Sequence, residues 1–153
     1  MNLVKEDSKI IGERSMKFNI FILVFCLGFL ACRNFTLHIE SNRKKKQLFL
    51  VKQRNVIDSV PYQSHEYTKY KILNGYLYYT DKVNQLSRIM IRIYKADINQ
   101  GKIKLVSQKN ILQFDLDNEV VSKINFREQY LYIETKDHSG RIKRKNKYML
   151  LEF

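Results

Sequence analysis

Residues 68–80 read TKYKILNGYLYYT, and this stretch decides the fold class. The pair Asn74-Gly75 lies between two runs rich in tyrosine and aliphatic residues. Asn-Gly is the typical two-residue loop of a β-hairpin, because both residues tolerate the positive φ that such a turn needs. The stretch therefore predicts an antiparallel hairpin with strands at 68–73 and 76–80.

The alternation of apolar and polar residues continues along the chain, and no stretch after Cys32 keeps an apolar period of 3.6 residues. Loops are expected at 55–66, around the single proline, and at 81–87. About ten strands are expected in all. Besides the hairpin, they lie at 35–40, 47–53, 88–98, 102–107, 111–116, 120–126, 129–135 and 142–153. The prediction is an all-β fold of antiparallel meander sheets after an N-terminal apolar helical segment.

A weak internal repeat suggests how these sheets are organised. Tyr76-Leu77-Tyr78 recurs as Tyr130-Leu131-Tyr132, which defines two units, 68–107 and 122–153. Each unit has the order strand, short turn, Tyr-Leu-Tyr strand, polar loop and long strand, as β-meanders do. Two further pairs match at the same spacing: Lys82 with Lys136, and Tyr94 with Tyr148.

The segment 93–102, IYKADINQGK, resembles the hairpin between the third and fourth strands of β-propeller repeats. The resemblance implies blades of four strands arranged around an axis. A propeller needs at least four blades to close, whereas this chain holds roughly two and a fraction. Three architectures stay open: a truncated or split propeller, a propeller completed by assembly, and a small sandwich or open meander.

An apolar run lies near the N-terminus, between Met16 and Cys32. Lys17 precedes it, and a basic residue followed by a compact apolar run is typical of a secretory signal peptide. Residues 18–31 would span about 21 Å as a helix, less than the ~30 Å of a bilayer's hydrocarbon core. A cleaved signal is therefore favoured over a membrane-spanning helix.

The end of this run, Phe29-Leu30-Ala31-Cys32, resembles the lipobox of bacterial lipoproteins. In that family the cysteine thiol is alkylated with diacylglycerol, and the signal is cut just before it. The resemblance implies that Cys32 is the lipidated residue and Ala31 the last residue of the signal. It implies a protein of the bacterial cell envelope, lipid-anchored at the outer membrane or on a periplasmic face. A plain cleaved signal and an uncleaved single-pass anchor remain the alternatives.

The chain is thus expected to have three parts. Residues 1–31 form the signal peptide, of which 1–15 are interpreted as an over-extended start. Residues 32–54 carry the lipidated cysteine, a basic tether and the first hairpin, and 55–153 form the antiparallel β domain. The other cysteine, Cys26, lies within the signal, so the mature chain keeps no thiol for a disulfide or a metal.

Residues that carry catalysis or hold metals show no familiar spacing. His38, His65 and His138 are far apart, no serine lies in a G-x-S-x-G elbow, and the five glycines form no phosphate loop. The segment 97–101 resembles part of a calcium loop, but its glycine comes one position early and a hairpin turn is expected instead. No enzyme activity, metal or cofactor is predicted.

Positive charge is the global feature with a physical consequence. The chain has 28 Lys and Arg against 15 Asp and Glu, a formal net charge of +13. Such density attracts lipid headgroups or polyanionic glycans, whereas export argues against nucleic acid as the partner. The residues expected to contact an anionic surface form two clusters: Arg43, Lys44, Lys45 and Lys46, then Arg141, Lys143, Arg144, Lys145 and Lys147.

The functional prediction is a non-catalytic binding or structural module held at the membrane through Cys32. Its expected partners are anionic envelope components or another protein. The alternative is a truncated or partial β-propeller that binds a ligand or a protein. The tyrosines of the repeat supply either strand packing or an aromatic binding face; they are Tyr76, Tyr78, Tyr79, Tyr130 and Tyr132.

Overall fold

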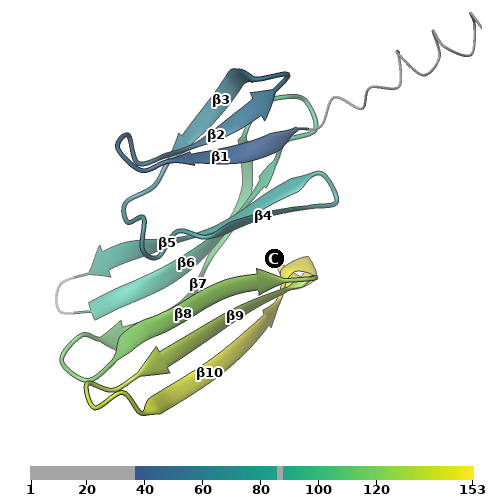
Figure 1. Ribbon diagram of the computed structural model, residues 1–153. Coiled ribbons are helices and arrows are strands. Elements are labelled where there is room, and N and C mark those ends of the chain that lie inside the picture. The colour runs from purple at the N-terminus through teal and green to yellow at the C-terminus, as the bar shows by residue number, and fades with distance from the viewer. Residues whose placement is uncertain (1–36, 86–87) are drawn as a thin grey trace, which may run out of the picture. The chain divides into compact units, whose positions relative to one another are not determined.

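A computed structural model describes residues 37–85 and 88–153 (Figure 1). These residues form ten β-strands and one short 3-10 helix, η1 (Leu150–Glu152). No helix in these two ranges has the length and apolar character to span a bilayer. The predicted signal peptide, its cleavage at Ala31 and the lipidation of Cys32 lie outside the described residues.

The strands form three antiparallel meander sheets, none of which closes on itself. Sheet A contains β1 (His38–Asn42), β2 (Gln47–Lys52) and β3 (Asn55–Pro61). Sheet B contains β4 (Tyr70–Leu73), β5 (Tyr76–Gln85), β6 (Arg88–Asp97) and β7 (Lys104–Asp115). Sheet C contains β8 (Val120–Arg127), β9 (Tyr130–Lys136) and β10 (Ile142–Met149). The prediction of an all-β fold built from antiparallel meanders is confirmed.

The Asn74-Gly75 hairpin forms as predicted, with Leu73 paired to Tyr76 across the turn. Asn74 and Gly75 both have positive φ, 51° and 77°, as a type I′ turn requires. A Cβ at position 75 would lie 2.3 Å from Oδ1 of Asn99. The turn therefore requires glycine for space as well as for φ.

Four segments differ from the prediction. The strand expected at 142–153 ends at Met149, and Leu150–Glu152 form η1. Residues 55–61 of the expected loop form β3, which pairs with β2 and ends at Pro61, so sheet A extends past the boundary expected after residue 54. Strand β5 continues beyond residue 80 and pairs with β6 along its whole length. The strands expected at 102–107 and 111–116 are one strand, β7. β3 and β7 are edge strands. Much of β3 and the first part of β7 are exposed and held by backbone pairing, so their apolar alternation is weak, whereas Leu112 and Phe114 near the end of β7 are buried in an apolar core.

Sheet B is buried on both faces. Adjacent residues of a strand point to opposite faces, and both Leu77 and Tyr78 of β5 are buried. Leu77 packs with residues of sheet A in one apolar core, here called the A–B core. Tyr78 packs with residues of sheet C in a second, the B–C core. This double burial explains why the Tyr-Leu-Tyr-Tyr run is apolar at every position.

The repeat corresponds to equivalent strands of sheets B and C. Leu77 in β5 and Leu131 in β9 are both fully buried in the middle of their sheets. The match of Tyr94 with Tyr148 is not equivalent, however, because Tyr94 pairs with Tyr79 whereas Tyr148 pairs with Leu131. Tyr78 pairs with a residue 17 positions further on, Lys95, whereas Tyr132 pairs with a residue 15 positions further on, Lys147, so the third strand of the repeat is shifted by two residues.

The equivalent positions on the third strands are Lys95 and Lys147. Lys95 lies opposite Tyr78 and Lys147 lies opposite Tyr132. Each lysine places its Nζ near both tyrosines of its Tyr-Leu-Tyr motif, at 4.7 and 5.7 Å from the ring centroids in sheet B and at 3.8 and 5.8 Å in sheet C. The repeated structural unit is thus a lysine over two tyrosines.

Candidate functional site

The candidate site is the face of sheet C that points away from the B–C core. Ile124, Leu131 and Ile133 are buried in that core, so their neighbours along the strands project from the opposite face. We call this opposite face the outer face of sheet C. It carries Lys123, Asn125 and Arg127 from β8, Tyr130, Tyr132 and Glu134 from β9, and Lys145 and Lys147 from β10.

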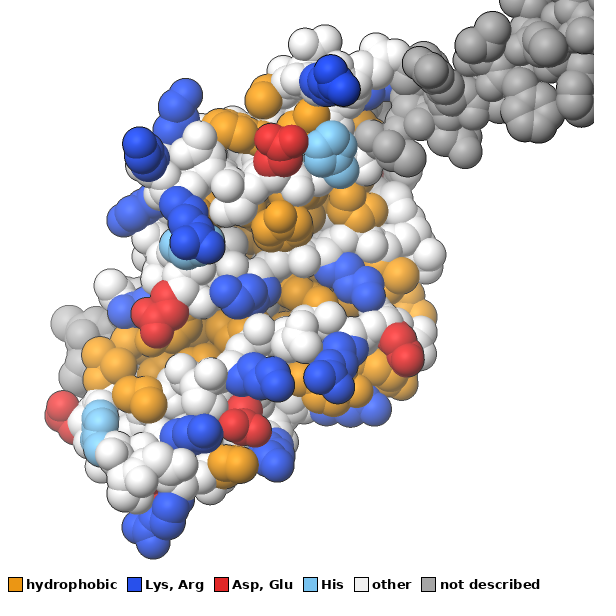
Figure 2. All heavy atoms as spheres, in the orientation of Figure 1, with side chains coloured by type: hydrophobic (Ala, Val, Ile, Leu, Met, Phe, Trp, Pro, Cys, Tyr) orange, Lys and Arg blue, Asp and Glu red, His pale blue; other side chains and the backbone are white. Residues whose placement is uncertain are grey.

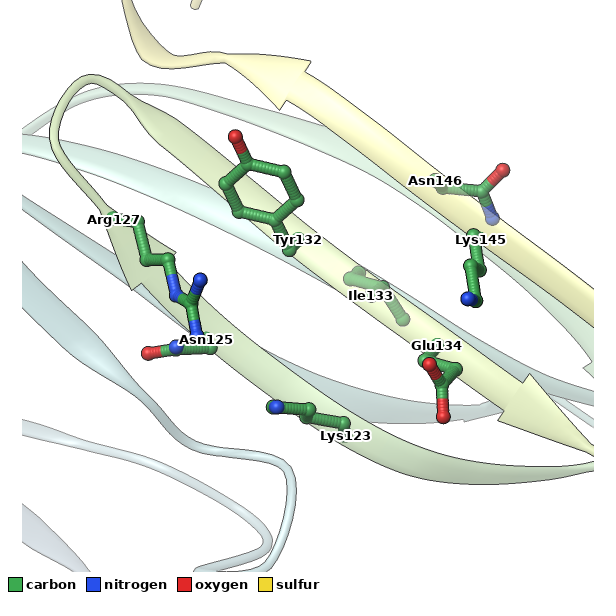
Figure 3. Close-up of a pocket in the computed structure, with 8 residues that line it drawn as sticks. All are labelled: Lys123, Asn125, Arg127, Tyr132, Ile133, Glu134, Lys145 and Asn146. Atoms are coloured by element: carbon green, nitrogen blue, oxygen red, sulfur yellow. The ribbon is translucent and has the colours of Figure 1, made fainter. Parts of the chain in front are cut away.

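Strand register arranges these residues in rows across the sheet (Figure 3). Lys123 and Lys145 flank Glu134 from either side. Asn125 and Lys147 flank Tyr132 in the next row. Directly opposite residues of antiparallel strands have Cβ atoms about 4.5–5.5 Å apart, so each row is a set of neighbouring side chains. These residues are far apart in the sequence, so the sequence alone does not show that their side chains are neighbours.

Two tyrosine rings form the apolar part of this face. The rings of Tyr130 and Tyr132 lie 6.3 Å apart at 58°, and both residues are half-buried. The Nζ of Lys147 lies 3.8 Å from the ring centroid of Tyr130. Such a cation–π contact contributes roughly 0.5–1 kcal/mol at an exposed site. It holds the lysine against the sheet, with its charge still open to solvent.

The outer face carries more positive than negative charge. A hollow of about 180 Å³ opens on it, lined by Lys123, Arg127 and Lys145 among others. Within the described ranges, none of Lys123, Arg127, Lys145 and Lys147 has a carboxylate within 4.0 Å. The one acid of the face, Glu134, is 4.0 Å from Lys136 and accepts a hydrogen bond from Ser122. Uncompensated cations of this kind attract anions.

Two further hollows continue this surface along β8. One shares Asn125 with the outer face and is lined by Arg43 and Lys69. The other shares Lys123 and is also lined by Lys69. Figure 2 shows Lys and Arg side chains over the face in view, with few acidic side chains among them. Edge strand β8 thus connects the basic residues of sheet C with those of the β1–β2 turn.

The second predicted basic cluster divides into two groups. Lys145 and Lys147 lie on the outer face, and Lys143 is exposed. Arg141 instead pairs with Asp137 at 3.2 Å. A hydrogen bond from the Ser139 hydroxyl, together with the backbone N–H of Arg141, lowers the pKa of Asp137 to about 2. This pair closes the β9–β10 turn.

Arg144 points inward and pairs with Glu119. Its Nε donates to Oε1 of Glu119 at 2.7 Å, and the Thr135 hydroxyl donates to the same carboxylate. The hydrogen bond from Arg144 is the main cause of a lowered pKa at Glu119, and it outweighs the burial that acts to raise this pKa. Arg144 therefore joins β10 to the β7–β8 connection.

The first predicted cluster, Arg43 to Lys46, forms the exposed β1–β2 turn. The backbone N–H of Lys45 donates to Oδ1 of Asn42 at 3.0 Å, which fixes the turn. In this cluster only Arg43 lines one of the hollows given above. Arg43 is therefore the residue of the first cluster that shares a hollow with β8.

Several residues of this surface escaped the sequence analysis. Lys123 and Arg127 are isolated cations in the sequence. Their even spacing along β8, which pairs with the strand of the Tyr-Leu-Tyr motif, is the one sequence signal that they share a face. His65, which is far from the other histidines in the sequence, is half-buried beside Tyr62. Among the described residues, no group of three His, Cys, Asp or Glu is placed to hold a metal ion.

Comparison with known proteins adds no relationship to this geometry. No protein-family model matches the chain, and the searches of curated proteins and of solved structures find no similar protein.

Proposed function

We propose that this chain is a non-catalytic binding module of the bacterial cell envelope, anchored through Cys32, that binds a polyanionic glycan on the outer face of sheet C. The observation that supports the proposal is a set of four cations on the same face as two tyrosine rings, none of which has a described carboxylate within 4.0 Å: Lys123, Arg127, Lys145 and Lys147.

The shape and chemistry of the face favour an extended, ring-containing polymer. The hollow on it is open and small, about 180 Å³, whereas sites that enclose a drug-sized molecule measure roughly 300–1,000 Å³. Aromatic rings offer flat apolar surfaces to sugar rings, and the lysines supply charge for acidic groups along a chain. Export through the proposed signal makes a glycan more accessible than nucleic acid.

The finer architecture that we propose is a partial propeller of three blade-like sheets. Each sheet is a meander, sheet B packs on both faces, and the Tyr-Leu-Tyr motif occupies the same place in sheets B and C. The outer face of sheet C is charged, and covering it with a further sheet would require desolvating Lys123 and Lys145. This cost favours a face that stays in contact with water and ligand.

The proposal predicts that three lysines of the outer face dominate glycan binding. In the triple variant K123Q/K145Q/K147Q, affinity of the full chain in detergent for polygalacturonate should fall at least tenfold. Each lysine near an anionic surface contributes on the order of 1 kcal/mol. Isothermal titration calorimetry at constant ionic strength measures the change, with uncharged dextran as the reference polymer.

A control variant removes the same charge elsewhere. Lys102, Lys104 and Lys109 are exposed at or near edge strand β7 of sheet B, and K102Q/K104Q/K109Q should retain most of the affinity. Equal losses in both triple variants would show that net charge alone drives the binding, and the proposal for the outer face would then be rejected.

A further inference from the structure

A second hollow lies where all three sheets contribute residues. It measures about 440 Å³. Arg43 comes from the β1–β2 turn and Tyr70 from β4, His65 and Lys69 come from the loop between β3 and β4, and Asn125 comes from β8. A hydrogen bond from the Tyr70 hydroxyl to the Ile39 carbonyl, at 3.3 Å, ties β4 to β1 beside it.

A buried carboxylate shapes the loop that carries His65 and Lys69. Asp81 is 4% exposed and accepts backbone N–H bonds from Gln63 at 2.6 Å and Ser64 at 3.1 Å. The Thr68 hydroxyl donates to the same carboxylate at 3.2 Å. These bonds hold the loop segment near both of its ends, so the backbone positions from which His65 and Lys69 project are set before any ligand arrives.

The hollow collects positive charge without a matching acid. The titratable groups that face His65 are Arg43 from the β1–β2 turn, Lys69 and Tyr62 from its own loop, and Tyr70 from β4. The residues that β8 contributes to the lining, Asn125 and Phe126, carry no charge. In the described part of the chain, neither Arg43 nor Lys69 has a carboxylate within 4.0 Å.

The imidazole of His65 is held by one nitrogen only. Its Nδ1 lies 3.2 Å from the Tyr62 hydroxyl, which also contacts the Ser41 hydroxyl at 3.3 Å. The Tyr62 hydroxyl donates to the Asn42 carbonyl at 3.4 Å, so in the protonated imidazole Nδ1–H can donate to the Tyr62 oxygen and Nε2–H is a free donor. No described residue forms a hydrogen bond with Nε2.

We infer that this hollow binds a phosphate group through Arg43, His65 and Lys69. A guanidinium binds two oxygens of a phosphate with its planar fork, a lysine adds a point charge, and an imidazole N–H adds a directed hydrogen bond. The hollow is open beyond these three side chains, so the phosphate can be free or can belong to a larger monoester. The hollow shares Asn125 with the outer face of sheet C, but none of its three proposed phosphate ligands is among the lysines proposed to bind the glycan, so the inference does not rest on the proposed function.

Phosphate binding at this site is coupled to the protonation of His65. Burial, Arg43 and Lys69 lower the pKa of His65 below 6.5 in the empty site. A bound dianion offsets both cations and raises this pKa. The bound state therefore takes up a proton between the two pKa values, and the affinity for the phosphate dianion increases as the pH falls through that window.

Proton NMR of the His65 ring in the full-length protein in detergent tests the site, with inorganic phosphate as the probe. Phosphate should shift the His65 signal saturably and raise its pKa. R43Q and K69Q should each weaken phosphate binding at least tenfold, whereas K44Q, one residue along the same exposed turn, should leave it unchanged. H65Q should retain weaker binding whose remaining pH dependence follows the second ionisation of phosphate itself.

Two results would overturn the inference. One is a His65 signal that phosphate does not move, and the other is a K44Q loss equal to that of R43Q. The K123Q/K145Q/K147Q variant should bind phosphate normally, so this site and the glycan surface can fail separately. Vesicles of phosphatidylcholine with phosphatidic acid distinguish the sources: competition with phosphate identifies a lipid headgroup, and phosphate binding without competition identifies a soluble phosphate ligand.

Discussion

Single residues decide how this small protein tolerates acid. Glu119 is 8% exposed and receives hydrogen bonds from Arg144 and Thr135. Its pKa is lowered in the folded protein, with the Arg144 hydrogen bond as the largest cause. A carboxyl group of this kind stabilises the fold above its unfolded pKa, near 4.5, and the contribution is lost as the pH falls through the lower folded value.

E119Q tests this contribution. We expect the variant to lose about 1–2 kcal/mol of unfolding free energy at pH 7, less than for a fully buried pair because the Arg144 side chain is 39% exposed. Between pH 5 and the acid limit, its stability should fall less steeply than that of the wild type. Urea denaturation at several pH values measures both effects. The control E152Q changes an exposed acid and should alter neither the stability at pH 7 nor its dependence on pH. If the stability of E119Q fell with pH as steeply as that of the wild type, Glu119 would not be the source of the acid sensitivity.

Turns provide the clearest test at the scale of secondary structure. Gly75 and Gly140 both have positive φ, 77° and 85°. A Cβ at position 140 would meet nothing within 4 Å, whereas one at position 75 would meet Asn99. The two glycines therefore separate the cost of backbone strain from the cost of the contact.

G140A should lower the free energy of unfolding by about 1 kcal/mol, because alanine is strained at this positive φ. G75A should lower it by roughly 1 kcal/mol more, because the Asn99 side chain must also move. Combining G75A with N99A should recover the additional loss. Thermal or urea unfolding of the three variants measures this. Equal losses of unfolding free energy in G75A and G140A would mean that the contact with Asn99 does not affect stability.

Strands explain which elements could be predicted from sequence. The Asn-Gly turn and the alternating core strands carry their signal locally, and they form as predicted. Strand β3 has a largely exposed pattern and is held by backbone pairing with β2, so its residues resemble a loop. The same applies to the polar middle of β7. Burial produces periodicity, whereas edge pairing does not.

The candidate surface depends on tertiary pairing even more strongly. A run of basic residues such as 141–147 is visible in the sequence, but strand alternation places Arg144 and Lys145 on different faces. Arg43, His65 and Lys69 come together only because Asp81 fixes the intervening loop. The basic residues could therefore be predicted from the sequence, but which of them lie together depends on the strand register and on the loop between β3 and β4.

At the scale of the whole molecule, the proposed lipid anchor and the basic surface complement each other. A single acyl chain gives only marginal membrane binding, and stable anchoring takes a second acyl chain or a polybasic patch. The basic residues Arg43 to Lys46 follow Cys32 closely in the sequence. Covalent lipid and the basic residues near it would together supply the attachment, and the cations on the outer face of sheet C would then be free to bind ligands.

The anchor is tested by the intact mass of the protein from the membrane fraction. We expect residues 32–153 plus a diacylglyceryl and a fatty acyl group, because the lipobox-like end of the apolar run places cleavage before Cys32. C32A should lose this modification, whereas C26A, which changes the other cysteine in the same run, should keep it. A mass that retains residues 16–31 in both variants would mean an uncleaved anchor. The basic β domain would still lie at the membrane in that case, but Cys32 would have no part in holding it there.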